Sequence, residues 1–189
     1  CVVLKPSEQT PLTALRLGAL IAGLFPAGVV NILFGRGASV GETLVNHAQV
    51  RMLSLTGSIP TGARIIAASA ASAKRLHMEL GGKAPVIVFD DADLDAVVEG
   101  IRTFGFYNAG QDCTAACRIY AQKGIYEKFV AALGAAAGSL KHGLQDDPAT
   151  ELGPLISDLH RQRVAGFVER ASALPHIEVV TGGQAPGEA

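Results

Sequence analysis

Short apolar runs with the length of β-strands alternate along this chain with segments that have the period of an amphipathic helix. Runs that are apolar on both faces are typical of the buried strands of a parallel sheet. Alternation of such strands with helices is the sequence signature of βαβ units. We therefore predict an α/β fold with a largely parallel sheet.

The expected strands cover residues 1–4, 29–34, 52–56, 78–80, 85–89, 118–122 and 177–180. The expected helices cover residues 13–24, 40–47, 61–72, 94–106, 127–140 and 159–173. Asp93 should cap the helix over 94–106 by accepting hydrogen bonds from the free amides of its first turn. Two consecutive glycines, Gly81 and Gly82, permit a change of chain direction. We place a domain boundary there, which gives the regions 1–81 and 82–189.

Apolar residues make up 49% of the 189 residues, and charged residues only 17%. This is an apolar composition for a free-standing domain of this size, so we expect part of the surface to contact a partner or another part of a longer chain. The longest run without a charged or strongly polar residue, residues 17–30, contains a proline. It is shorter than the roughly 20 residues that a membrane span needs, so it is predicted to be a core segment.

A formal net charge of −1 leaves no basic surface of the kind that nucleic acids bind. Three cysteines without paired spacing favour a reducing compartment, and the cytoplasm is the predicted location. The five histidines are scattered without metal-ligand spacing, so no metal site is predicted. The chain begins in a strand-like run without an initiating methionine or a leader, and we expect it to be an internal piece of a longer protein.

Cys113 lies 34 positions (113 − 79) after Glu79, and the two residue types together suggest covalent chemistry on an aldehyde. A thiolate can add to a carbonyl and hold the oxidised product as a thioester. A carboxylate elsewhere in the fold can deprotonate the water that releases this product. We predict that Cys113 is the nucleophile and Glu79 the general base.

Residues 56–62 form a glycine-containing link between a predicted strand and a predicted helix. Free amides and the positive end of a helix dipole at such a junction suit a pyrophosphate, and Gly57 and Gly62 let a phosphate approach the backbone. The segment lacks the dinucleotide fingerprint with three glycines. A tight turn without a ligand therefore remains the alternative.

Lys5 and Glu8 follow the first strand, at the carboxyl edge where open α/β sheets bind ligands. Both side chains can hydrogen-bond ribose hydroxyls, and a carboxylate there favours NAD over NADP because it repels a 2′-phosphate. The alternative is that Glu8 only stabilises the entry of the following helix. From these residues alone, the second interpretation is preferred.

Four motifs occur in a characteristic order and spacing: KPSE at 5–8, TGS with a later glycine at 56–62, ELGGK at 79–83, and NxGQxC at 108–113. Over its whole length the chain thereby resembles the NAD(P)-dependent aldehyde dehydrogenases. Residues 81–95 and 108–118 look most like the bacterial γ-aminobutyraldehyde (aminoaldehyde) dehydrogenases, followed by the betaine-aldehyde dehydrogenases. The resemblance implies a Rossmann-like parallel sheet over 1–81 and the first part of an α/β catalytic domain over 82–189.

The resemblance also implies roles for single residues. Cys113 would attack the aldehyde to give a hemithioacetal, whose hydride passes to NAD, and Glu79 would activate the water that hydrolyses the thioester. Lys5 and Glu8 correspond to contacts of the adenosine ribose. Two further correspondences are Ser58 with a pyrophosphate contact and Leu80 with a backbone contact near the nicotinamide.

The resemblance further implies that the full-length protein is a homo-oligomer, a dimer or a tetramer. It also implies an asparagine upstream of Lys5 that completes the oxyanion hole with the backbone amide of Cys113. A glutamate downstream binds the nicotinamide ribose. Neither residue belongs to this chain, so we expect the chain alone to be inactive.

Asp112 stands directly before the nucleophile, where a carboxylate disfavours the thiolate. Its presence is explained if it attracts a cationic amine at the far end of the substrate, which favours an ω-aminoaldehyde. The alternative is that Asp112 only caps the following turn. The residues alone do not decide between the two.

Two other functions are compatible with parts of the sequence. A cysteine hydrolase would combine Cys113 with a histidine, but it leaves residues 5–8 and 56–62 without a role. A non-catalytic chain is the second alternative, against which the presence of both Cys113 and Glu79 argues.

Overall fold

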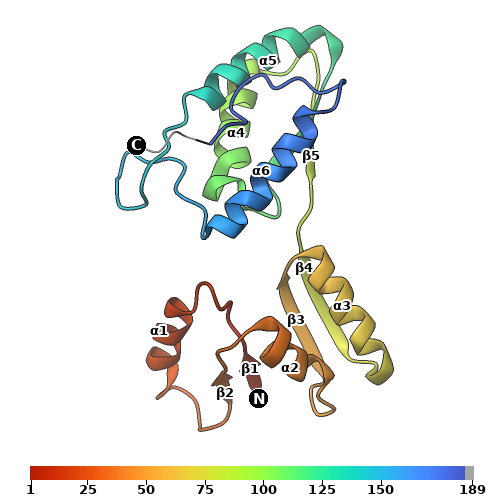
Figure 1. Ribbon diagram of the computed structural model, residues 1–189, viewed down its shortest axis with the longest axis vertical. Coiled ribbons are helices and arrows are strands. Elements are labelled where there is room, and N and C mark those ends of the chain that lie inside the picture. The colour runs from red at the N-terminus through yellow and green to blue at the C-terminus, as the bar shows by residue number, and fades with distance from the viewer. Residues whose placement is uncertain (186–189) are drawn as a thin grey trace. The chain divides into compact units, whose positions relative to one another are not determined.

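The computed structural model describes residues 1–185 and divides into two compact units, Cys1–Leu80 and Gly81–Ala189. The last four residues of the predicted 82–189 region lie outside the described residues. Three strand pairs carry the fold, and each is parallel with a helix in the connection (Figure 1). The predicted α/β class with parallel strands is confirmed. The assignment of the two units to a cofactor domain and a catalytic domain stays a prediction.

The first unit contains two strand–helix–strand segments. The first segment consists of β1 (Val2–Leu4), α1 (Leu12–Ile21) and β2 (Val30–Ile32). A π-helical turn, η1 (Gly37–Gly41), and α2 (Glu42–Asn46) follow. The second segment consists of β3 (Met52–Gly57), α3 (Ile59–Ser69), the 3₁₀ turn η2 (Ala70–Ser72) and β4 (Arg75–Leu80).

Strands β3 and β4 pair in parallel register from Met52↔Arg75 to Gly57↔Leu80. Burial alternates along both strands, so one face of the pair is half-buried and apolar and the other is exposed. Helix α3 covers the apolar face, and a β-carbon added to Gly62 would lie 2.8 Å from the methyl groups of Leu80. Gly62 therefore permits the close approach of α3 to β4.

The second unit contains the best-packed core of the described residues. Its elements are β5 (Ala84–Val88), α4 (Leu94–Phe106), the 3₁₀ segment η3 (Tyr107–Gly110), β6 (Ala116–Ala121), α5 (Lys123–Gly138) and α6 (Asp158–Ser172). The buried core consists of Val88 of β5, Ile101 of α4, and Ile125 and Phe129 of α5. These contacts fix the strand pair that flanks the loop of Cys113.

Two carboxylates hold helix starts in the second unit. Asp93 accepts a hydrogen bond from the backbone N–H of Ala96 at 3.1 Å, which confirms the predicted cap of α4. Asp90, at the end of β5, accepts from the backbone N–H of Ile125 in the first turn of α5 at 3.1 Å. Gly124 leaves the space for this contact, because an added β-carbon would lie 2.6 Å from the Asp90 carboxylate.

Several predicted boundaries are wrong. Residues 177–180 form no strand in the described part of the chain; Val180 instead lies against Gly134 of α5. Strand β4 begins at Arg75 rather than at residue 78. The predicted strand was too short because polar side chains on the exposed face interrupt the apolar run in the sequence. Helix α5 begins at Lys123 rather than at residue 127. The other elements agree with their predicted positions to within a few residues.

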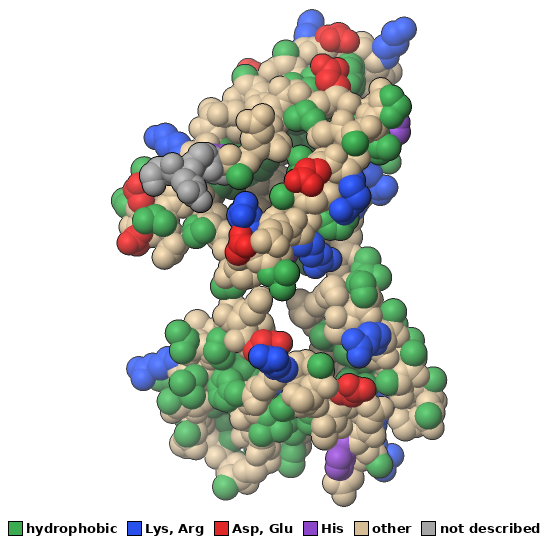
Figure 2. Space-filling view, in the orientation of Figure 1, with side chains coloured by type: hydrophobic (Ala, Val, Ile, Leu, Met, Phe, Trp, Pro, Cys, Tyr) green, Lys and Arg blue, Asp and Glu red, His purple; other side chains and the backbone are tan. Residues whose placement is uncertain are grey.

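Large apolar side chains remain exposed on both units, as Figure 2 shows in green. Among them are Leu12 of α1, 76% exposed, and Ile87 of β5, 65% exposed. This agrees with the expectation that part of the surface of this apolar chain contacts something else. Within the described residues, no helix is both long and apolar enough to cross a membrane.

Candidate active site

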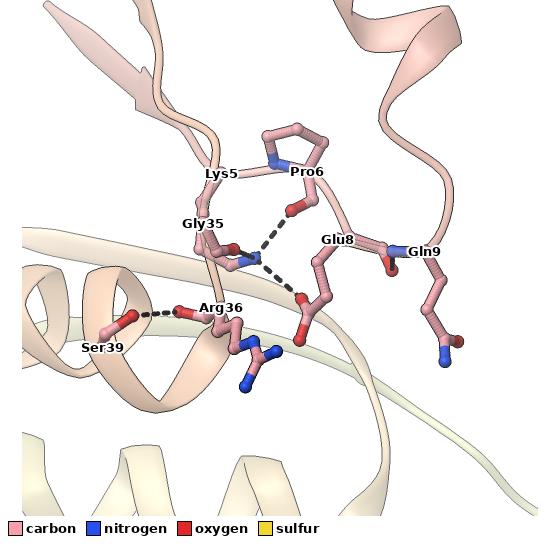
Figure 3. A network of polar contacts seen from close by, with 8 residues as sticks. Lys5, Pro6, Glu8, Gln9, Gly35, Arg36 and Ser39 are labelled. Carbon is pink, nitrogen blue, oxygen red and sulfur yellow. Dashed lines mark hydrogen bonds and ion pairs between the residues drawn. The ribbon is translucent and has the colours of Figure 1, made fainter. Parts of the chain in front are cut away.

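Lys5 is the centre of a polar network at the carboxyl end of β1 (Figure 3). Its Nζ donates to the carbonyl oxygen of Pro6 at 2.6 Å and to that of Gly35 at 3.0 Å, and it lies 3.5 Å from Glu8 Oε2. The Lys5 side chain is only 17% exposed. The two residues predicted to bind ribose are thus brought together, with the ammonium group held by three oxygen atoms.

The carboxylate of Glu8 is stabilised in its charged form. Its own backbone N–H, then the charge and hydrogen bond of Lys5, and finally the backbone N–H of Gly37 hold the pKa of Glu8 below its ordinary value. Glu8 is therefore ionised at neutral pH. An ionised carboxylate accepts hydrogen bonds from hydroxyl groups and repels phosphate, as the predicted preference for NAD requires.

A groove of about 340 Å³ adjoins Lys5 within the first unit. It lies between the η1–α2 segment and α3, and its walls include Lys5, Gly41, Glu42, Thr61 and Arg64. Its volume is at the lower end of the range for small-molecule sites, about 300–1,000 Å³. Part of a ligand could lie here beside the pair of Lys5 and Glu8.

Ser58 occupies the N-cap of α3. Its Oγ accepts a hydrogen bond from the backbone N–H of Thr61 at 3.3 Å and lies 2.9 Å from Thr61 Oγ1. The structure thus gives Ser58 a capping role. Gly62 has a packing role, because it lies against the side chain of Leu80. Gly57 ends β3 next to this cap. Pyrophosphate binding by this turn stays a prediction.

Glu79 lies on the exposed face of β4 and belongs to a row of three polar side chains in contact. His77 Nε2 lies 3.1 Å from Glu79 Oε1, and His77 Nδ1 lies 3.0 Å from Ser54 Oγ on β3. Neither Ser54 nor His77 was predicted from the sequence to belong to the site. The signal was available, because residues two apart in a strand share a face, but the predicted strand began only after His77.

Cys113 is exposed in the turn between η3 and β6. The preceding backbone is left-handed at two residues that are not glycine, Asn108 (φ 51°) and Ala109 (φ 56°), and again at Gly110 (φ 75°). Asn108 and Gln111 brace this segment, since the side-chain amide of each donates to the backbone carbonyl of the other at 3.3 and 3.1 Å. Backbone strain of this kind is concentrated at functional sites.

Asp112 makes the contacts expected of a turn cap. Its Oδ1 accepts from the backbone N–H of Thr114 at 3.1 Å, and the Thr114 hydroxyl lies 3.1 Å from both carboxylate oxygens. The Thr114 N–H, then the Thr114 hydroxyl and the Cys113 thiol hold the pKa of Asp112 below its ordinary value. Asp112 is therefore ionised at neutral pH. The substrate role predicted for it is compatible with this charge and stays a prediction.

Two of the sequence motifs meet within the second unit. A β-carbon added to Gly82 would lie 3.7 Å from the backbone oxygen of Cys113. Glu79 and Leu80 belong to the first unit and Cys113 to the second. Among the described residues, no group of three histidine, cysteine or acidic side chains is arranged to hold a metal ion.

Comparison with known proteins gives consistent matches over this chain. The model of the aldehyde dehydrogenase family matches residues 1–189. Betaine aldehyde dehydrogenase of Cereibacter sphaeroides is 45% identical over 186 residues, which cover 97% of this chain and 38% of that protein. Betaine aldehyde dehydrogenase 2 of Rhizobium meliloti is 48% identical over 172 residues, which cover 90% of this chain and 35% of that protein.

Solved structures resemble the chain equally well. A betaine aldehyde dehydrogenase of Staphylococcus aureus in complex with NAD⁺ has a TM-score of 0.94 at 38% identity, covering 98% of this chain and 37% of that one. The lactaldehyde dehydrogenase of Escherichia coli has a TM-score of 0.93 at 40% identity, and the match covers 98% of this chain and 39% of that one. The chain thus spans about 38% of the length of the relatives that it matches.

Proposed function

Because this chain belongs to the aldehyde dehydrogenase family, we propose that the complete protein oxidises an aldehyde to its carboxylic acid with NAD. The observation that carries the proposal is the loop of Cys113. It exposes a thiol, contains left-handed backbone conformations at residues 108–110 shortly before that thiol, and adjoins Gly82. A nucleophile that must meet a carbonyl in one geometry benefits from such a braced loop.

In the proposed reaction, the Cys113 thiolate forms a bond to the aldehyde carbon and gives a hemithioacetal. Bound NAD would supply the acceptor for the hydride of this carbon, and Cys113 would then carry a thioester. Glu79 removes a proton from water, the resulting hydroxide adds to the thioester carbonyl, and the carbon–sulfur bond breaks. The products are the acid, reduced cofactor and a regenerated thiol.

The residues proposed to hold NAD fit that cofactor by their chemistry. The ionised Glu8 and the bound ammonium group of Lys5 supply an acceptor and a donor for ribose hydroxyls beside the groove in the first unit. We assign Ser58 and the backbone of Gly57 to the pyrophosphate, with Gly62 keeping α3 close to the sheet, and the backbone of Leu80 to the nicotinamide end. The negative charge of Glu8 favours NAD over NADP.

The substrate that we propose is an ω-aminoaldehyde such as 4-aminobutanal. Its support is the ionised carboxylate of Asp112 next to the nucleophile, which attracts a cation at the far end of the substrate. Betaine aldehyde is the second candidate, since it also carries a positive charge and since relatives bear that name. Assembly into a homo-oligomer in the cytoplasm is supported by the exposed apolar surface and by three cysteines that form no disulfide.

Two measurements on the complete protein test these proposals. Cys113→Ala should abolish aldehyde-dependent reduction of NAD, and retention of activity would exclude the thioester route. Asp112→Asn should raise the KM for 4-aminobutanal much more than the KM for butanal, because only the amine carries the charge. Equal effects on both aldehydes would leave Asp112 with its turn-capping role alone.

A further inference from the structure

We propose that His77 is a positioning residue for Glu79, and that Ser54 in turn orients His77. The inference rests on the proposed function, because it concerns the step in which Glu79 activates water. It assigns a role to two residues of the β3–β4 pair that are remote from Cys113 in sequence. The basis is a row of two contacts, a hydrogen bond between Ser54 and His77 and a close polar contact between His77 and Glu79.

The two contacts are consistent with one form of His77. A charged carboxylate can only accept, so the approach of His77 Nε2 to Glu79 Oε1, at 3.1 Å, is favourable when Nε2 carries a proton. In the neutral imidazole the other nitrogen, Nδ1, is then an acceptor, and it lies 3.0 Å from the hydroxyl of Ser54, which can donate to it. Ser54 is therefore compatible with the form of His77 that attracts Glu79, and its contact orients the ring.

The strand pairing explains why these three side chains meet. Ser54 and His77 are direct partners in the register of β3 and β4. Glu79 follows His77 by two residues and so projects from the same face. This is the exposed face of the pair, while α3 covers the other, and the only other charged side chain that these two strands place on it is Arg75.

The consequence for catalysis concerns the two oxygens of Glu79. Oε1 is engaged by His77, which restricts the rotation of the carboxylate. Oε2 then stays available to take the proton from water. Without the imidazole, the side chain samples more rotamers, and a smaller fraction of molecules presents the base in a productive orientation. His77 itself takes up no proton in this scheme.

The experiment separates the two halves of the reaction in the complete protein. Stopped-flow absorbance of reduced nicotinamide gives the rate of hydride transfer in the first turnover, and quenched-flow analysis of the acid product gives the rate of thioester hydrolysis. Both are measured with 4-aminobutanal and with butanal for His77→Leu, His77→Gln, Ser54→Ala and, as a matched control from the same face of β4, Arg75→Gln.

His77→Leu should slow thioester hydrolysis by about threefold to tenfold, the effect of losing one polar contact to a charged group, while hydride transfer and KM stay unchanged. His77→Gln should restore most of the rate, because its amide nitrogen can still donate to Glu79. Ser54→Ala should have a smaller effect of the same kind, and Arg75→Gln none.

Loss of both rates in equal proportion in His77→Leu would mean a general structural effect and would overturn the proposal, as would an unchanged rate of hydrolysis. Glu79→Gln distinguishes this failure from failure of the proposed function. If hydrolysis survives in Glu79→Gln, Glu79 is not the base and both proposals fall. If it is lost there but unaffected in His77→Leu, only the role of His77 falls.

Discussion

The left-handed backbone at Ala109 predicts a substitution that stabilises the protein and impairs its activity. Ala109 has φ 56° and ψ 36°, a conformation that costs an L-residue about 1–2 kcal/mol. Glycine adopts this conformation freely, but its greater conformational freedom in the unfolded chain lowers the free energy of unfolding by about 0.4–1 kcal/mol. The difference predicts that Ala109→Gly raises the free energy of unfolding by about 0.5–1 kcal/mol.

Ala73 offers a matched control, because it has φ 48° in the connection between η2 and β4 and lies in the other unit. Ala73→Gly should give a similar gain in stability by the same mechanism. The two variants should differ in activity. A more mobile loop presents Cys113 correctly in a smaller fraction of molecules, so only Ala109→Gly should lower the rate of hydride transfer in the first turnover.

The assay is equilibrium unfolding by denaturant of the complete protein and both variants, with first-turnover kinetics on the same preparations. A loss of stability in Ala109→Gly beside a gain in Ala73→Gly would refute the strain at Ala109. Equal loss of activity in both variants would refute the link between this strain and the geometry of Cys113.

Two further predictions concern the second unit. Gly124→Ala should destabilise it by about 1–3 kcal/mol, because the new methyl group would lie within 3 Å of the Asp90 carboxylate; denaturant unfolding measures the cost. The backbone N–H of Lys141, and after it Arg102, hold the pKa of Glu151 below its ordinary value of 4.5. Glu151 therefore stabilises the folded state above pH 4.5, and this stabilisation is lost as the pH falls through the lowered pKa. Glu151→Gln should therefore speed hydrogen exchange over residues 140–152 at neutral pH, and the difference from the unsubstituted protein should shrink below pH 4.5. A difference that persists unchanged in acid would contradict the ionic origin.

The fold could be predicted where local signals and packing agree. Asp93 and the apolar face that follows it define α4, and the structure has that helix at the predicted residues. Residues 177–180 have the composition of a strand, but Val180 lies against α5, and composition does not reveal which element a segment meets. The start of β4 was missed because Arg75 and His77, on its exposed face, alternate with apolar residues on its other face. The segment therefore has no continuous apolar run at its start.

Part of the candidate site could be predicted from the sequence. Motif spacing indicated Glu79 and Cys113, and the position of Lys5 and Glu8 after the first strand indicated a ribose site, but not the contact between the two side chains. The contact of His77 with Glu79 depends on a strand that begins earlier than predicted. The left-handed conformation of Ala109 depends on the path of the chain through η3, which the propensity of alanine does not specify.

The register of β3 and β4 also limits which insertions and deletions the connection between α3 and β4 can accept. A shift of β4 by one residue would turn Glu79 toward the apolar face under α3 and would expose Met78 in its place. A shift by two residues would keep Glu79 on its face, but would move it about 7 Å along the strand and away from Ser54. The number of residues in 70–74 must therefore stay unchanged for Glu79 to keep both its face and its position along the strand, although the segment itself carries none of the proposed chemistry.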